Sequence, residues 1–249
     1  MWRVENREVY FIILAFFAEV IGTLSGVSSS TIFVPIGVLL ESLQLTLALT
    51  ACLHVLGNSI RLMLYWRDIN WPLTLKFGGP SVLLAGLGAI YSDHLSKSTF
   101  AIILGCFLIS LSLIFLLQKN SKIFKGRFIP YLGGGLSGFL TGILGSGGAV
   151  RSLALTGFEL TPFAFTATST LIDLGGDIFR LKVYIDKGYL QKENYFYIPL
   201  LMIVAVVANW WARKWLEKIP REKFKKIVLS FVLITGLISL SSGLIQIRK

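Results

Sequence analysis

The sequence predicts an all-α polytopic membrane protein made of two inverted-topology repeats, each a re-entrant or broken helix hairpin followed by three transmembrane helices. Three observations lead to this fold class. The chain of 249 residues is 54% hydrophobic and only 15% charged, and its mean hydropathy of +0.73 exceeds that of soluble globular domains. Its apolar residues gather in long stretches. Two further apolar stretches are interrupted at corresponding places, which indicates a duplication.

Six apolar stretches are long enough to cross the hydrocarbon layer of a membrane, which is roughly 30 Å thick and needs a helix of about 20 residues. They cover residues 46–66, 72–91, 99–118, 162–184, 195–213 and 224–246. No polar segment between them is long enough to bury a core of its own. We therefore expect the lipid bilayer, and no soluble domain, to surround these helices.

Two more apolar stretches are too short to span. Residues 9–24 run into a polar patch and resume at 32–41, whereas residues 130–144 run into the sequence Gly-Ser-Gly-Gly and resume at 149–158. Glycine costs roughly 1 kcal/mol per residue in a helix interior. Unwound backbone at membrane depth is tolerated only inside protein or along a cavity. Both stretches are therefore predicted to be re-entrant hairpins or broken helices.

The two halves of the chain align at an offset of 119 residues. Residues 57–65 and 176–184 share the pattern Gly-x-x-x-Arg-Leu-x-x-Tyr, and one interrupted stretch followed by three spans occurs twice. This agreement predicts a first repeat at 1–118, a cytoplasmic linker at 119–129 and a second repeat at 130–249. Because three spans give an odd number of crossings, the second repeat must be inverted.

The distribution of charge predicts the orientation in the cell membrane. With the linker inside, twelve Lys and Arg residues fall in cytoplasmic loops and eight on the other side, as the positive-inside rule favours. Both termini are then extracytoplasmic. These loops explain the net charge of +11 without a nucleic-acid partner. Cys52 and Cys106 both lie in predicted spans and support neither a disulfide framework nor a metal site, and no cofactor is expected.

The interrupted stretches are the predicted binding site. A half-helix that begins near residue 147 or 149 presents unpaired N–H groups and the positive end of its dipole, which favours an anion, and transporters with discontinuous helices bind ions in this way. The candidate residues supply backbone N–H groups, hydroxyls and one guanidinium: Ser25, Gly26, Ser28, Ser29, Ser30, Thr31, Gly145, Ser146, Gly147, Gly148, Ala149 and Arg151. The alternative is that the small residues only allow close helix packing.

Arg151 is the sharpest single candidate. It lies in the first turn of the second half-helix, where a cation opposes the helix dipole unless an anion sits nearby. The alternative is a structural ion pair with Asp173 or Asp177.

Polar residues of other predicted membrane segments are candidates for coupling or gating: Glu19, His54, Asn58, Arg61, Asp173, Asp177 and Arg180. Glu19 should face inward, protonated or paired, because a carboxylate facing lipid costs several kcal/mol. His54 is either a proton carrier or a structural side chain.

Asp173, Asp177 and Arg180 in the span 162–184 lie along one helix face, at positions i, i+4 and i+7. They form either a proton-coupling and gating group or a stripe of salt bridges. Arg61 and Arg180 lie within about five residues of their helix ends and are expected to snorkel to opposite interfaces.

The interrupted stretches carry a family resemblance. The segments SGVSSSTIFVP (Ser25 to Pro35) and GILGSGGAVRS (Gly142 to Ser152) are each followed by an alanine- and threonine-rich span and the Gly-x-x-x-Arg-Leu-x-x-Tyr ending. They resemble the TauE/SafE sulfite exporter family of membrane permeases over essentially the whole chain. The resemblance implies a secondary transporter for export or uptake of small sulfur-containing anions, such as sulfite or sulfonates like sulfoacetate, and export is the expected direction. Sulfate, thiosulfate or a carboxylate are the alternative substrates, and proton coupling and a homodimeric state are left open.

An enzyme is the rival class. Residues 135–138 have the Gly-x-Ser-Gly form of rhomboid intramembrane proteases, in which a histidine must activate the serine. His54 is the histidine within a predicted span, and it precedes Ser137, opposite to the rhomboid order. We therefore expect a transporter and no catalytic residues.

Overall fold

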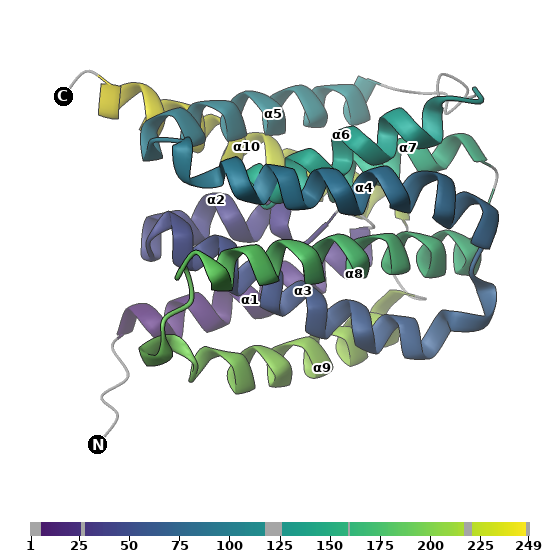
Figure 1. The fold of residues 1–249 in the computed structure, drawn as a ribbon, viewed down its shortest axis with the longest axis horizontal. Coiled ribbons are helices and arrows are strands. Elements are labelled where there is room, and N and C mark those ends of the chain that lie inside the picture. The colour runs from purple at the N-terminus through teal and green to yellow at the C-terminus, as the bar shows by residue number, and fades with distance from the viewer. Residues whose placement is uncertain (1–5, 26–27, 118–125, 159, 217–220, 248–249) are drawn as a thin grey trace.

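The computed structural model describes residues 6–25, 28–117, 126–158, 160–216 and 221–247. All regular elements in these ranges are helical (Figure 1). The α-helices are α1 (Asn6–Ser25), α2 (Ser30–Leu40), α3 (Leu43–Tyr65), α4 (Trp71–Tyr91), α5 (Lys97–Leu117), α6 (Ile129–Leu144), α7 (Gly148–Leu155), α8 (Pro162–Asp186), α9 (Tyr197–Leu216) and α10 (Arg221–Ile247). The expected all-α class is confirmed. The six predicted spans correspond to α3, α4, α5, α8, α9 and α10, and the interrupted stretches to the pairs α1–α2 and α6–α7.

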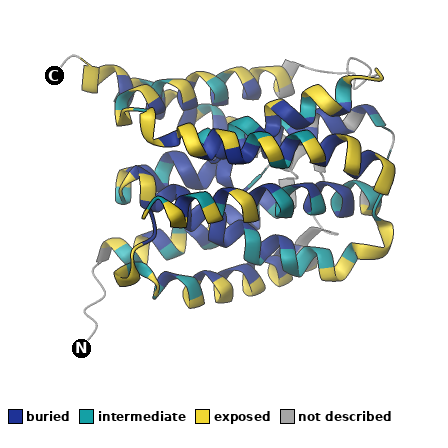
Figure 2. Ribbon diagram, viewed as in Figure 1, coloured by how far each residue is buried: buried dark blue, intermediate teal, exposed yellow. Residues whose placement is uncertain are grey.

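Several of these helices suit a membrane. Four described segments are long and apolar enough to cross it: Leu43–Asp68, Trp71–His94, Lys97–Ile114 and Lys192–Ala212. Helix α8 has 25 residues and is long enough as well, but it buries charged side chains inside the protein. Exposed positions concentrate on the outer faces of the helices (Figure 2). Many of them are large and apolar, among them Leu75, Leu83, Met202 and Ile203, as a surface in contact with lipid requires.

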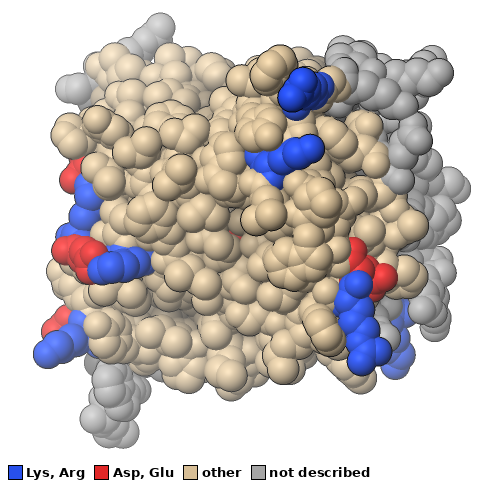
Figure 3. All heavy atoms as spheres, turned by 45° about the vertical axis from the view of Figure 1, so that its right-hand side comes forward, with Lys and Arg blue, Asp and Glu red and all other residues tan. Residues whose placement is uncertain are grey.

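Figure 1 shows how the helices are oriented. The start of α1 and the end of α10 lie at the left end of the bundle, whereas α6 begins at the right end. Helix α3 runs from left to right and α8 from right to left. On the face drawn in Figure 3, Asp and Glu side chains appear mainly near the left and right edges, and the area between them is largely uncharged.

Equivalent polar residues begin α3 and α8. Ser42 Oγ accepts a hydrogen bond from the Leu45 N–H at 3.2 Å, and Thr161 Oγ1 accepts one from the Ala164 N–H at 3.2 Å. Each side chain satisfies one of the N–H groups that a helix start leaves unpaired. The two capping residues correspond at the repeat offset seen in the sequence.

A stripe of glycines brings α6 against α4. A Cβ added at Gly134, Gly138 or Gly142 would lie 2.2, 2.0 and 2.0 Å from the carbonyl oxygens of Phe77, Ser81 and Ala85. No side chain fits at those distances, so the helix backbones touch here. The close-packing interpretation therefore explains the glycines within α6, which is a continuous helix. It leaves the break between α6 and α7 to be explained separately.

Candidate functional site

The two interrupted stretches meet inside the bundle. Ser146 Oγ, between α6 and α7, donates a hydrogen bond to Thr31 Oγ1 in the first turn of α2 over 3.4 Å. A Cβ added at Gly148, the first residue of α7, would lie 2.5 Å from Ser28 Cβ, so the two breaks are in direct contact. The buried members of the predicted binding set are Ser29, Ser30, Thr31, Gly145, Ser146, Gly147, Gly148, Ala149 and Arg151.

Glycine is required where α6 ends. Gly145 has a φ of +69°, a left-handed conformation that residues with a Cβ rarely adopt. A Cβ added at Gly147 would lie 1.9 Å from the carbonyl oxygen of Ser137, and Ser137 Oγ donates to the Gly147 carbonyl over 3.1 Å. The break thus folds back closely on α6. In the first break, Gly26 lies outside the described residues, as does the side chain of Ser25.

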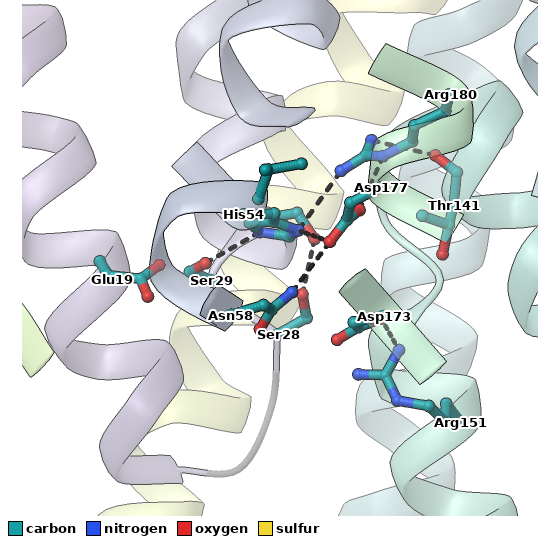
Figure 4. A network of polar contacts seen from close by, with 12 residues as sticks. Glu19, Ser28, Ser29, His54, Asn58, Thr141, Arg151, Asp173, Asp177 and Arg180 are labelled. Atoms are coloured by element: carbon teal, nitrogen blue, oxygen red, sulfur yellow. Dashed lines mark hydrogen bonds and ion pairs between the residues drawn. The ribbon is translucent and has the colours of Figure 1, made fainter. Parts of the chain in front are cut away.

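Arg180 is the centre of a buried polar network (Figure 4). Its side chain is 0% exposed. Nε donates to Asp177 Oδ1 over 2.8 Å, Nη1 donates to the Thr141 carbonyl over 3.2 Å, and Nη2 lies 3.3 Å from His54 Nδ1. The prediction that Arg180 snorkels to the interface was wrong, because acceptors inside the protein satisfy its donors and α8 continues beyond it to Asp186.

His54 connects this network to the first break (Figure 4). Its Nε2 lies 3.0 Å from Ser29 Oγ, and its Nδ1 lies 3.6 Å from Asp177 Oδ2. The same carboxylate oxygen accepts a hydrogen bond from Asn58 Nδ2 at 2.9 Å. Nδ1 therefore faces both the guanidinium of Arg180 and the carboxylate of Asp177, while Nε2 faces the hydroxyl of Ser29.

Arg151 forms the ion pair that was one of the two predicted roles. It is 4% exposed, its Nη1 pairs with Asp173 Oδ1, and its Nε donates to Ser169 Oγ over 2.8 Å. The partner is Asp173 because Arg180 occupies Asp177. Of the predicted stripe on α8, only Asp177 and Arg180 pair along the helix, at i and i+3.

Glu19 faces inward and is paired, as expected. It is 0% exposed, and its Oε1 accepts hydrogen bonds from Arg61 Nη2 at 2.5 Å and from Asn209 Nδ2 at 3.3 Å. The expected snorkelling of Arg61 was therefore wrong as well, because the buried carboxylate holds its guanidinium inside the bundle. A Cβ added at Gly57 would lie 2.7 Å from Glu19 Oε1, so the glycine makes room for this ion pair.

A cavity of about 90 Å³ lies beside these groups. Its walls are Gly22, Thr23, Ser28, His54, Asn58, Arg61, Arg151, Ser152, Phe165, Thr166, Ser169, Thr170 and Asp173. They include the guanidinium groups of Arg61 and Arg151, which are paired with the carboxylates of Glu19 and Asp173, and the remaining polar groups are mainly hydroxyls. At about 30 Å³ per water molecule the cavity holds roughly three waters, which is the scale of a small inorganic anion.

Side chains around the cavity are more exposed toward one end of the bundle than toward the other. The side chains of Arg61 and Asp173 are 21% and 14% exposed, whereas Thr50 and Arg180 are 0% exposed. Arg61 is near the end of α3, and Asp173 is nearer the start of α8 than Arg180 is. Since α3 ends and α8 begins at the right of Figure 1, the more exposed of these side chains lie toward that end, where α6 also begins.

Sequence reasoning missed several residues of the site. Ser169 and Thr170 on α8 line the cavity, and Asn209 on α9 holds Glu19. One face of α8 carries Thr166, Ser169, Thr170 and Asp173, because they are spaced at i, i+3, i+4 and i+7. This polar face could have been found from the sequence. The Thr141 carbonyl that binds Arg180 gives no signal, because every residue has a carbonyl.

One protein-family model matches most of the chain. The family model for the sulfite exporter TauE/SafE matches residues 11–238. The chain belongs to the TauE/SafE family. A comparison with curated proteins and one with solved structures found no match.

Membership of the TauE/SafE family decides the functional class. Its members are membrane transporters of sulfite and related sulfur anions and not enzymes, so the rhomboid alternative is discarded. The contacts agree, because the Ser137 hydroxyl is engaged by Gly147 and His54 by Ser29. Within the described residues, no cluster of three His, Cys, Asp or Glu side chains could hold a metal ion.

Proposed function

We propose that this protein exports a small sulfur oxyanion, with sulfite as the first candidate, and that the anion binds in the cavity beside Arg151. The observation that carries the proposal is the composition of that cavity: two guanidinium groups and a set of hydroxyls surround a space of about 90 Å³ where the two breaks meet. A compact oxyanion needs several donors in a confined space, and charge-assisted bonds from guanidinium groups are the strong ones. Larger sulfonates such as sulfoacetate fit less well in this space.

The packing of the helices supports an inverted repeat. If α1–α5 correspond to α6–α10, the pairing of α4 with α6 corresponds to that of α9 with α1, and the pairing of α4 with α8 corresponds to that of α9 with α3. All four pairs are in contact, and so are α3 with α8 and α5 with α10, which a two-fold operation maps onto themselves. The positions of the chain ends in Figure 1 suit the same arrangement.

The orientation predicted from charge places the open end of the cavity in the cytoplasm. The more exposed side chains around the cavity lie toward the end at which α6 begins, next to the linker that carries excess Lys and Arg. The described state therefore suits loading of the anion before export.

The test is a flux assay with purified protein in liposomes. We expect sulfite to be transported. Added unlabelled sulfite should inhibit the flux of labelled sulfite more strongly than sulfate, thiosulfate, taurine or sulfoacetate does. A ligand that binds the native state also raises its apparent thermal stability, so the same panel in a thermal-shift assay should give the same order. Absence of both flux and thermal shift with every anion of the panel would refute the proposal.

A further inference from the structure

The repeat offset produces a contact between equivalent residues. Asn58 and Asp177 are 119 positions apart and share a hydrogen bond of 2.9 Å. Two equivalent groups that touch must lie near the two-fold axis that relates their repeats. The axis therefore passes through the polar network of Figure 4, next to the cavity.

The same offset maps the cavity onto a second set of residues. Ser169 corresponds to Thr50, Phe165 to Thr46 and Arg61 to Arg180. The cavity residues His54 and Asp173 correspond to each other. Thr46, Thr50 and Arg180 are all 0% exposed, so this second set is closed in the state described.

Thr46 gives independent evidence about the second set. Its hydroxyl is buried and has no hydrogen-bond partner among the described residues. Its methyl group packs toward α2, since a Cβ added at Gly37 would lie 2.8 Å from Thr46 Cγ2. Valine fills the same volume without a hydroxyl, and an unsatisfied buried polar group calls for an explanation. Contact of the Thr46 hydroxyl with water or an anion in another conformational state of the protein would explain it.

We infer that the protein forms a second anion cavity, lined by Thr46, Thr50, His54, Asp177 and Arg180, which opens at the opposite end of the bundle when the described cavity closes. This inference rests on the proposed function and its inverted repeat. Thr46 and Thr50 lie near the start of α3 and Arg180 toward the end of α8, at the left of Figure 1. The packed network around Arg180 closes that end in the present state.

The second cavity holds an anion less strongly than the first. Arg151 corresponds to Ile32, so the second set has no cation from the short helix of the hairpin. It has one guanidinium, that of Arg180, which is paired with Asp177, whereas the first cavity has two guanidinium groups, those of Arg61 and Arg151, which are paired with Glu19 and Asp173. An anion is therefore captured where α3 ends and released where α3 begins.

The first test is cysteine accessibility in a transport-active background in which Cys52 and Cys106 are replaced by alanine. Thr50→Cys reports the second cavity, Ser169→Cys reports the first, and Leu49→Cys is the control because Leu49 is 0% exposed and belongs to neither set. We expect a membrane-impermeant maleimide to modify Ser169→Cys without added anion. Modification of Thr50→Cys should rise about tenfold when sulfite is transported, as a shift of population between two states requires, while Leu49→Cys stays unmodified.

Two outcomes of this experiment are distinguishable. If Thr50→Cys reacts no faster than Leu49→Cys in protein that transports sulfite, the second cavity is refuted and the proposed function stands. If the background protein transports no anion of the panel, the proposed function is refuted and this inference with it.

The second test uses the unsatisfied hydroxyl. Thr46→Val should raise the melting temperature by about 2 °C or more, because it removes an unpaired buried group, and should lower sulfite flux at least about threefold, because it removes a donor from the second cavity. Thr235→Val is the matched control, since its buried hydroxyl donates to the Val232 carbonyl at 3.0 Å within α10. Wild-type flux in Thr46→Val would refute the inference.

Discussion

Replacing Arg151 with glutamine tests both its ion pair with Asp173 and its proposed role in anion binding, because the two have different consequences. The guanidinium is 4% exposed and pairs with Asp173, whose side chain is 14% exposed. Breaking a fully buried pair by removing one partner costs about 3–5 kcal/mol. Since Asp173 keeps some contact with the cavity, we expect a loss of about 2–3 kcal/mol in the free energy of unfolding.

If Arg151 binds the anion as proposed, loss of the same guanidinium also weakens anion binding. Charge-assisted hydrogen bonds contribute roughly 1.5–3 kcal/mol, so Arg151→Gln should raise the Kd for sulfite about ten- to a hundredfold. Arg151→Lys should recover only part of this affinity, because an ammonium lacks the planar fork that engages two oxygens at once.

A double-mutant cycle with Asp173→Asn provides the assay. Melting temperature and sulfite Kd are measured for both single variants and for the double variant, with Arg127→Gln as a control for loss of an exposed arginine outside the cavity. The double variant should regain most of the lost stability, because it no longer buries an unpaired carboxylate. It should not regain affinity. A well-folded Arg151→Gln protein with unchanged Kd would contradict the binding role, and wild-type stability in that variant would contradict the ion-pair role.

Three further predictions concern other contacts. Gly57→Ala should destabilise the protein by about 1–3 kcal/mol, because the new methyl group would lie 2.7 Å from a carboxylate oxygen of Glu19. The control Gly176→Ala should not, because its methyl group would lie 3.5 Å from its nearest neighbour. Equal melting temperatures of the two variants would contradict the close approach of Glu19 to Gly57. Gly138→Ala should separate α6 from α4 and lower expression and melting temperature, whereas Gly79→Ala, with nothing within 4 Å, should be neutral or stabilising by up to about 1 kcal/mol. If Glu19 carries a proton during transport, Glu19→Gln should retain sulfite binding but lose flux driven by a pH gradient; equal gradient-driven flux in the variant and the wild type would exclude that role.

The local sequence determined the helices and the position of both breaks. Runs of about 20 apolar residues can satisfy their backbone in a membrane only as helices, so α3, α4, α5 and α9 followed from composition alone. Gly145 marks the end of α6 because a left-handed residue is needed there. Such signals depend on neighbours in the chain and are readable without a fold. The inward orientation of Glu19 followed in the same way, because lipid offers an anion no partner.

Tertiary structure alone decided which charges pair. Three arginines and three carboxylates inside the bundle, all buried or partly buried, can be matched in several ways, and spacing along one helix favoured Asp173, Asp177 and Arg180 as a single stripe. Packing instead places α7 beside the first half of α8, so that Asp173 pairs with Arg151 and only Asp177 is left for Arg180. It also places Glu19 of α1 beside Arg61 of α3. An arginine side chain near a helix end reaches either the membrane interface or a neighbouring helix. Which of the two it reaches depends on where a carboxylate from a distant part of the chain lies. Sequence periodicity does not encode that position.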